Sequence, residues 1–298
     1  TITKNYLIVS NTKNYKKRID KADVSEAETN EKFSYQIDDS PHKDELSEFI
    51  DLFVIYVSDN IFELFPKKND ASIADAILEI FRKREDIDIF KDFLVVSERF
   101  NGLNHIRIMP WSGKGEYYLP FDSETYMAYT STNLDFDSEM LRYGYQSLAT
   151  PASVIDFNMK TKEKNILKEH EVLGGKFDKN NYTEERIWAT AKDGTKVPIS
   201  MVYRKGILKN GKNPLLLYAY GSYGVTMDCH FSSVRLSLLD RGFIFAIAHV
   251  RGGEYLGRKW YEDGKLLKKK NTFTDFIDCS QFVIDEKYTS AQNLYAEG

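Results

Sequence analysis

Residues 215–220 read LLLYAY and residues 243–250 read FIFAIAHV, two almost unbroken apolar runs of strand length. Runs of this kind are typical of strands that are covered on both faces, as in a parallel sheet with helices on either side. Between them, residues 233–241 have the spacing of a helix that Gly242 would end. The stretch therefore predicts a strand, a helix and a second, parallel strand.

The sequence on both sides extends this pattern. Upstream, residues 186–192 and 196–203 alternate around Asp193-Gly194, a strong hairpin signal, and Pro198 predicts an edge or a bulge there. Downstream, residues 272–275 have capping-box spacing, and an apolar stripe follows at helical intervals before a last strand at 292–295. A hairpin followed by strand, helix, strand, helix and strand is the opening of an α/β-hydrolase sheet.

The first 183 residues have a different sequence pattern. Strand-length runs of β-branched and aromatic residues at 5–10, 53–58, 92–98 and 153–158 are separated by polar turns, and residues 71–81 have helical spacing. An interval of roughly 40 to 55 residues is the period of propeller blades. No repeated signature decides between a propeller and a β-sandwich, so both stay open on periodicity alone.

Composition limits the classes of function. The 298 residues are 42% hydrophobic and 14% aromatic, enough for one large or two ordinary domains. A net charge of −4 with interleaved lysines argues against nucleic acid as a main partner, and no apolar run reaches the roughly 18 residues that span a membrane. The two cysteines, Cys229 and Cys279, have neither disulfide-framework nor metal-ligand spacing, so a cytoplasmic location without cofactor is expected.

A hydrolase of this fold needs a serine on a strand-to-helix turn, a histidine base, an acid and donors to the oxyanion. No Gly-x-Ser-x-Gly motif occurs in the 298 residues. The usual triad partners follow the serine along the chain, so the five histidines, His42, His105, His170, His230 and His249, are expected to be structural or surface residues.

Three segments carry a resemblance to a known family. Residues 218–224 (YAYGSYG), 249–257 (HVRGGEYLG) and 260–273 (WYEDGKLLKKKNTF) resemble the prolyl oligopeptidase family of serine peptidases, and within it the oligopeptidase B (protease II) group. The likeness is strong from about residue 93. It implies that residues 1–183 are the C-terminal blades of a β-propeller and that residues 184–298 are the first part of an α/β-hydrolase peptidase domain. By this resemblance the chain is a fragment ending just before the nucleophile elbow, whose remaining propeller and hydrolase parts are its partners.

The resemblance also assigns site residues. Tyr220 matches the tyrosine whose hydroxyl donates to the oxyanion, and a phenol suits that role because it stays protonated at neutral pH. Tyr223 matches an aromatic residue that packs against substrate near the primary pocket. Asp228 matches the first of two acids that favour a basic residue one position inside the cleavage site, with His230 in place of the second. The simpler alternatives are that Tyr220 ends a buried strand with its hydroxyl at the rim, that Tyr223 is a core tyrosine and that Asp228 is an exposed loop aspartate.

The expected function is that of a serine oligopeptidase that cuts short peptides after Lys or Arg. The chain alone is expected to be inactive, because the serine, aspartate and histidine of the triad are absent from it. A non-catalytic propeller-based binding module and a prolyl-specific oligopeptidase are the alternatives. The lysine run 268–270 could bind anions, but a solvated turn before a helix is the preferred interpretation. Residues 251–253 lack dinucleotide-motif spacing, and their glycines are expected in turns.

Overall fold

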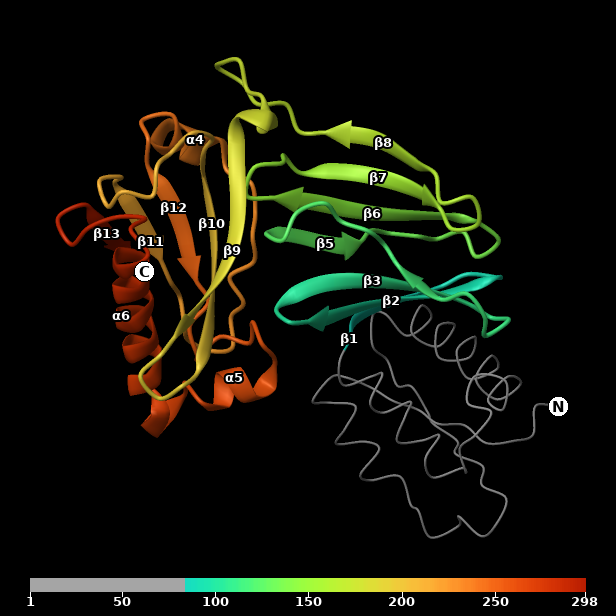
Figure 1. The fold of residues 1–298 in the computed structure, drawn as a ribbon. Coiled ribbons are helices and arrows are strands. Elements are labelled where there is room, and N and C mark those ends of the chain that lie inside the picture. The colour runs from blue at the N-terminus through green and yellow to red at the C-terminus, as the bar shows by residue number, and fades with distance from the viewer. Residues whose placement is uncertain (1–83) are drawn as a thin grey trace, which may run out of the picture.

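Three sheets make up the part of the chain that the computed structural model describes, residues 84–298 (Figure 1). The strands predicted at 5–10 and 53–58 and the helix predicted at 71–81 lie outside the described residues.

The first two sheets are four-stranded antiparallel meanders, each with its strands in sequence order. One contains β1 (Arg84–Ile89), β2 (Phe93–Phe100), β3 (Leu103–Pro110) and β4 (Tyr117–Tyr118), and the other contains β5 (Tyr126–Thr130), β6 (Met140–Ser147), β7 (Ser153–Asn158) and β8 (Lys164–Glu169). Four-stranded meanders are the units of a β-propeller. Strand β4 is only two residues long.

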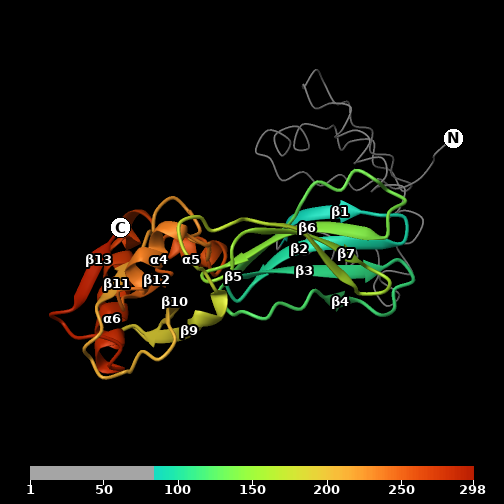
Figure 2. The ribbon, with the colours of Figure 1, turned by 90° about the horizontal axis from the view of Figure 1, so that it is seen from above.

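One apolar cluster joins these two sheets. Alternate residues of β2, β3, β6 and β7 point into it and are almost fully buried: Val95, Ile106, Ile108, Leu141, Tyr143 and Phe157. The alternation follows from the two-residue period of a strand, which sends every second side chain to the same face. In Figure 1 the two sheets lie one above the other at one end of the described chain, with the third sheet at the other end, and Figure 2 shows this division from above.

The third sheet has the order β13-β11-β12-β10-β9. Its strands are β9 (Tyr182–Thr190), β10 (Lys196–Arg204), β11 (Leu215–Tyr218), β12 (Ile244–Ala248) and β13 (Leu294–Glu297). Strand β11 is parallel to β12 and β13, whereas β10 is antiparallel to β9 and β12. This is the predicted hydrolase opening, with the β9–β10 hairpin turning at Asp193-Gly194 as expected.

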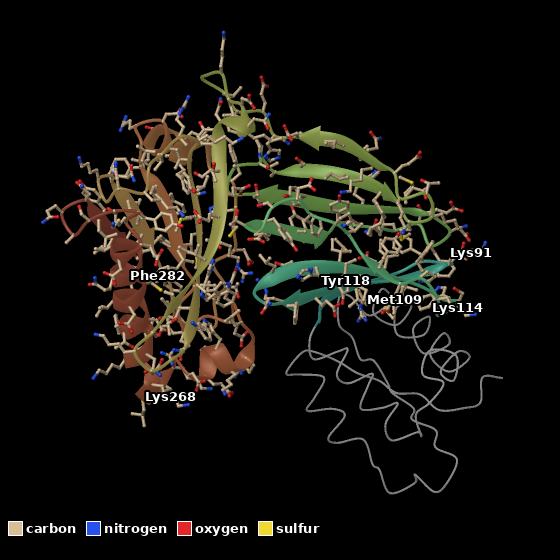
Figure 3. All side chains as sticks on the ribbon, viewed as in Figure 1. Lys91, Met109, Lys114, Tyr118, Lys268 and Phe282 are labelled. Carbon is tan, nitrogen blue, oxygen red and sulfur yellow. The ribbon has the colours of Figure 1, made fainter. Side chains whose placement is uncertain are left out.

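Helices cover both faces of this sheet. They are α4 (Ser233–Leu239), α5 (Arg258–Glu262) and α6 (Lys270–Asp285), with short 3-10 turns η2 (Lys179–Asn181) and η3 (Leu266–Lys268). Leu215 and Leu217 of β11 pack with residues of α6, including Phe282 (Figure 3), while Leu216 and Tyr218 pack on the α4 side. Because both faces of β11 are covered, its sequence is continuously apolar.

Three local predictions are wrong. Helix α6 begins at Lys270, because η3 runs almost directly into it, so Thr272 lies inside the helix and is not its cap. Phe273 and Ile277, two members of the apolar stripe at helical intervals, are exposed rather than packed on the sheet. The edge or bulge predicted at Pro198 is absent from β10, which is an interior strand without a register shift. Pro198 lies just before the β10–β12 ladder begins at Ile199, and its carbonyl accepts from the His249 amide at 3.0 Å.

Candidate active site

The carboxyl ends of the parallel strands meet at one edge of the third sheet. Ala219 follows β11 and Gly298 follows β13, and a Cβ atom placed on Gly298 would lie 2.3 Å from the Ala219 carbonyl oxygen. The Ala219 amide also donates to the Glu297 carbonyl at 3.0 Å. Ligands of open α/β sheets bind beyond this edge, so the residues after β11 occupy the place where a site is expected.

Tyr220 lies in the loop that leaves β11. The residue is 37% exposed, which fits a strand-end tyrosine with its hydroxyl at the rim as well as a site residue. A half-exposed phenol at the carboxyl edge of the sheet is able to offer its hydroxyl to a bound group. Donation to an oxyanion stays a prediction.

The backbone after Tyr220 is closely packed. A Cβ atom on Gly221 would lie 2.4 Å from Thr272 Cγ2 and 2.7 Å from Val250 Cγ2, so only glycine fits there. A Cβ atom on Gly252, whose φ is +105°, would meet the Gly221 carbonyl oxygen at 2.1 Å. The Gly224 amide donates to the Gly252 carbonyl at 3.1 Å. The loop after β11 is thus held against the loop after β12 and against α6. Gly252 lies in a turn, as expected, whereas Gly253 forms a β-bridge with Gly224.

Tyr223 lies in the same loop in the left-handed region, with φ of +58°, and the residue is 85% exposed. It is therefore not a core tyrosine. Contact with substrate stays a prediction for this residue.

Asp228 is paired rather than exposed. Arg99 Nη1 and Nη2, from β2 of the first sheet, donate to its two carboxylate oxygens at 2.7 and 3.1 Å. Neighbouring contacts also cross between the meander sheets and the third sheet: Arg186 donates to the Asn101 carbonyl, Thr125 to Glu184 at 2.7 Å, and the Phe231 amide to Gln146 at 3.1 Å. No local pattern in the sequence marks Arg99, because its partner lies 129 positions away.

His249 forms a serine–histidine contact that resembles a catalytic pair. Its Nε2 atom lies 2.8 Å from Ser200 Oγ, and its ring stacks on Tyr255 at 3.6 Å between centroids. Both Ser200 and His249 are buried, so substrate has no access to the hydroxyl. Burial holds the pKa of the His249 imidazole well below its usual value, and the charges of Arg186 and Arg99 lower it further. The pair is a neutral structural contact, consistent with the expectation for His249.

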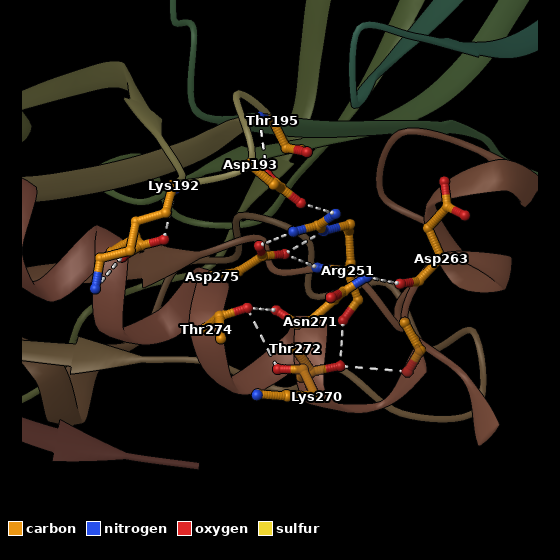
Figure 4. Close-up of polar contacts among 12 residues, drawn as sticks. Lys192, Asp193, Thr195, Arg251, Asp263, Lys270, Asn271, Thr272, Thr274 and Asp275 are labelled. Atoms are coloured by element: carbon orange, nitrogen blue, oxygen red, sulfur yellow. Dashed lines mark hydrogen bonds and ion pairs between the residues drawn. The ribbon is translucent and has the colours of Figure 1, made fainter. Parts of the chain in front are cut away.

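Arg251, after β12, organises the surroundings (Figure 4). Its guanidinium donates to Asp275 of α6 at 2.9 and 2.5 Å and contacts Asp193 of the β9–β10 turn at 2.7 Å. Its carbonyl accepts from Thr272 Oγ1 at 2.7 Å. One arginine therefore fixes the hairpin, the helix and the loop that packs on Gly221 relative to one another.

No group of three or more His, Cys, Asp or Glu side chains within residues 84–298 is arranged to hold a metal ion. The same described part of the chain has no helix long and apolar enough to cross a membrane.

Two family models match the sequence. The model of the prolyl oligopeptidase N-terminal beta-propeller domain matches residues 68–170, and that of the prolyl oligopeptidase family matches residues 229–298. The chain belongs to the prolyl oligopeptidase family. The meander sheets are accordingly part of the β-propeller, which resolves the choice between propeller and sandwich, and the third sheet is the start of the α/β-hydrolase domain. The division at residues 183 and 184 stays a prediction.

Within the prolyl oligopeptidase family the chain is close to oligopeptidase B. It is 45% identical over 71% of its length to dipeptidyl aminopeptidase BI of Pseudoxanthomonas mexicana and 40% identical over 70% to protease 2 of Moraxella lacunata. The structure of oligopeptidase B from Trypanosoma brucei with covalently bound antipain, in its closed form, matches 72% of the chain with a TM-score of 0.65 and 40% identity. The chain spans 29% to 31% of the lengths of these relatives.

Proposed function

We propose that this chain is part of a serine oligopeptidase that hydrolyses short peptides, with cleavage after Lys or Arg. The single observation that supports the proposal most is the position of Tyr220. It lies at the carboxyl edge of a parallel hydrolase sheet, half exposed and next to the end of β13. The similarity to protease 2 and to oligopeptidase B supports the basic specificity.

The polypeptide of these 298 residues alone is proposed to be inactive. It contains no Gly-x-Ser-x-Gly motif. Its buried Ser200–His249 pair offers no accessible nucleophile. The partners of the chain in the active protein are then further hydrolase and propeller segments and a short peptide substrate, in the cytoplasm, with neither nucleic acid nor a membrane taking part.

A dipeptidyl aminopeptidase is a second candidate, favoured by the 45% identity to the Pseudoxanthomonas relative. A prolyl-specific oligopeptidase and a non-catalytic binding module are the third and fourth candidates. The peptidases differ in substrate: an oligopeptidase accepts an N-terminally blocked peptide amide, whereas a dipeptidyl aminopeptidase needs a free amino terminus two residues from the scissile bond.

The test uses the complete protein encoded by the gene that carries this sequence. It is assayed with fluorogenic amides that end in Arg, Lys or Pro, each with blocked and free amino termini, and with a fluorophosphonate label. We expect labelling and release from blocked Arg and Lys amides. Three other outcomes would refute the proposal. Release from Pro amides alone would support prolyl specificity, and release from free dipeptide amides alone would support the aminopeptidase. Neither labelling nor release would support the binding module. The polypeptide of residues 1–298 is the control, and its labelling at one serine would contradict the inactivity proposed for it.

A further inference from the structure

The lysine run 268–270 is divided by the structure. Lys268 is exposed and pairs with Asp263 at 2.6 Å, and Lys270 is exposed as well. Lys269 is partly buried and turns toward the loop after β11. A uniformly solvated turn, the interpretation preferred from the sequence, therefore does not describe this residue.

The Lys269 ammonium group contacts the loop directly. Nζ donates to the Gly221 carbonyl and to Ser222 Oγ, the latter at 2.7 Å. Within residues 84–298, Lys269 forms no ion pair with a carboxylate. Burial lowers the pKa of the Lys269 ammonium group, as expected for a cation that is removed from water without an acidic partner.

The position of this charge is unfavourable for the helix that follows. Lys269 is the N-cap of α6, and the first turn of α6 contains no acidic residue. A cation at a helix N-terminus opposes the helix dipole. Lys269 therefore does not stabilise helix α6 through the helix dipole. Its side chain contacts the loop after β11 instead.

The loop that Lys269 contacts bears Tyr220. The side chain of Tyr220 is attached one residue before Gly221, and among the described residues no hydrogen bond restrains its hydroxyl. The direction of that hydroxyl therefore depends on the backbone of residues 220–222. This backbone is fixed by the close approach of Thr272 to Gly221, by the Gly224–Gly252 hydrogen bond and by Lys269.

We infer that Lys269 is a positioning residue for the oxyanion-binding loop: by holding Gly221 and Ser222 it directs the Tyr220 hydroxyl toward the substrate. The inference rests on the proposed function, in which Tyr220 donates to the oxyanion. Small misplacements of a catalytic donor reduce turnover strongly, because the donor acts on charge that develops only in the transition state. Loss of Lys269 should therefore affect kcat rather than KM.

The first test is kinetic and uses the complete protein with a blocked Arg amide. We expect Lys269→Met to lower kcat roughly 10- to 100-fold with KM within about twofold. Lys269→Arg, which retains the donors and the charge, should recover most of the activity, and the matched control Lys270→Met should stay within about twofold of wild type. Wild-type turnover in Lys269→Met would overturn the inference.

A double-mutant cycle distinguishes positioning from a general structural role. If Lys269 acts through Tyr220, adding Lys269→Met to Tyr220→Phe should lower kcat by less than about threefold more. An undiminished loss in the Tyr220→Phe background would contradict the inference.

A second measurement does not depend on activity, so it separates this inference from the proposed function. Hydrogen–deuterium exchange of peptides covering residues 219–225 should be faster in Lys269→Met than in wild type, and unchanged in Lys270→Met. Should Lys269→Met not fold, Ser222→Ala, which removes one of the two contacts, should give a smaller increase in the same peptides. Unchanged exchange in these peptides would overturn the positioning role even if the protein proved to have no peptidase activity.

Discussion

Arg99 and Asp228 form a bidentate ion pair between the propeller part and the hydrolase part of the chain. The pair joins β2 to the segment that follows the Tyr220 loop, and Arg99 also donates to the Gly102 carbonyl and to Asn104 Oδ1, each at 3.0 Å. The side chains are only 12% and 20% exposed. Because the pair is largely shielded from water, removing one partner leaves the other without solvation, which costs more than breaking a surface ion pair.

Breaking this pair from either side should weaken the protein. We expect Arg99→Met and Asp228→Asn each to lower the free energy of unfolding by about 3 kcal/mol, since each leaves a shielded charged or polar partner behind. The double variant should lose less than the sum, with a coupling energy of at least about 1 kcal/mol. Urea unfolding of the four proteins measures this, and strictly additive losses would show that the residues do not interact in solution.

The same variants test the predicted subsite role of Asp228. Because Arg99 engages both carboxylate oxygens, a basic substrate side chain would have to share them. Asp228→Asn should therefore change the ratio of kcat/KM for Arg-Arg and Gly-Arg amides by less than about threefold. A tenfold or larger drop in preference for Arg-Arg would instead support direct binding by Asp228.

Asp275 is the most deeply buried member of the Arg251 network, with no exposed surface. Asp275→Asn removes the charge that balances Arg251 and should lower the free energy of unfolding by about 3 to 5 kcal/mol. Asp285→Asn, at the exposed end of the same helix, is the matched control and should stay within about 0.5 kcal/mol of wild type. Thermal or urea unfolding checks both, and equal effects would rule out a special role for the Arg251–Asp275 pair.

Asp193 should make this network sensitive to acid. Hydrogen bonds from Thr195, together with Arg251, lower the pKa of the Asp193 carboxyl to about 2 from its ordinary value near 4. A lowered folded-state pKa stabilises the folded protein above the ordinary pKa and loses that effect as pH falls through the folded value. The stability difference between wild type and Asp193→Asn should thus be constant above about pH 5 and shrink between about pH 4 and pH 2. Urea midpoints across that range measure it, and a difference that is independent of pH would refute the assignment.

The sequence predicted the third sheet well because its signals are local. The apolar runs at 215–220 and 243–250 and the Asp193-Gly194 turn each act within a few residues, and each forms the expected element. The prediction that helix α6 begins with a capping box at 272–275 was wrong, because the helix begins upstream, directly after η3. Thr272 instead packs against Gly221, a tertiary contact. Tyr220 is a candidate site residue on the basis of a motif, and its role stays a prediction. The contacts of Arg99 and Lys269 were not predicted, because they join segments 129 and 48 residues apart.

Gly221 tests how closely the loop is packed. A methyl group there would overlap Thr272 Cγ2, Val250 Cγ2 and the Arg251 carbonyl oxygen, all within 2.8 Å. Gly221→Ala should lower the free energy of unfolding by about 1 to 3 kcal/mol through overpacking, and it should reduce turnover by displacing Tyr220. Gly175→Ala is the control, because nothing lies within 4 Å of its added methyl group. Equal stability of the two variants would mean that the loop relaxes without resistance.

The role of Tyr220 itself is tested by removing only its hydroxyl. In the complete protein, Tyr220→Phe keeps the ring and removes one hydrogen bond that matters mainly in the transition state, so kcat should fall on the order of 10²-fold with little change in KM. Tyr218 is the matched control: it is the last residue of β11, packs on the α4 side of the sheet, and Tyr218→Phe should stay within about threefold of wild type. Steady-state kinetics on a blocked Arg amide decide the matter. If Tyr220→Phe turns over within about twofold of wild type, Tyr220 does not donate to the oxyanion, and the motif that identified it marks only the end of a strand.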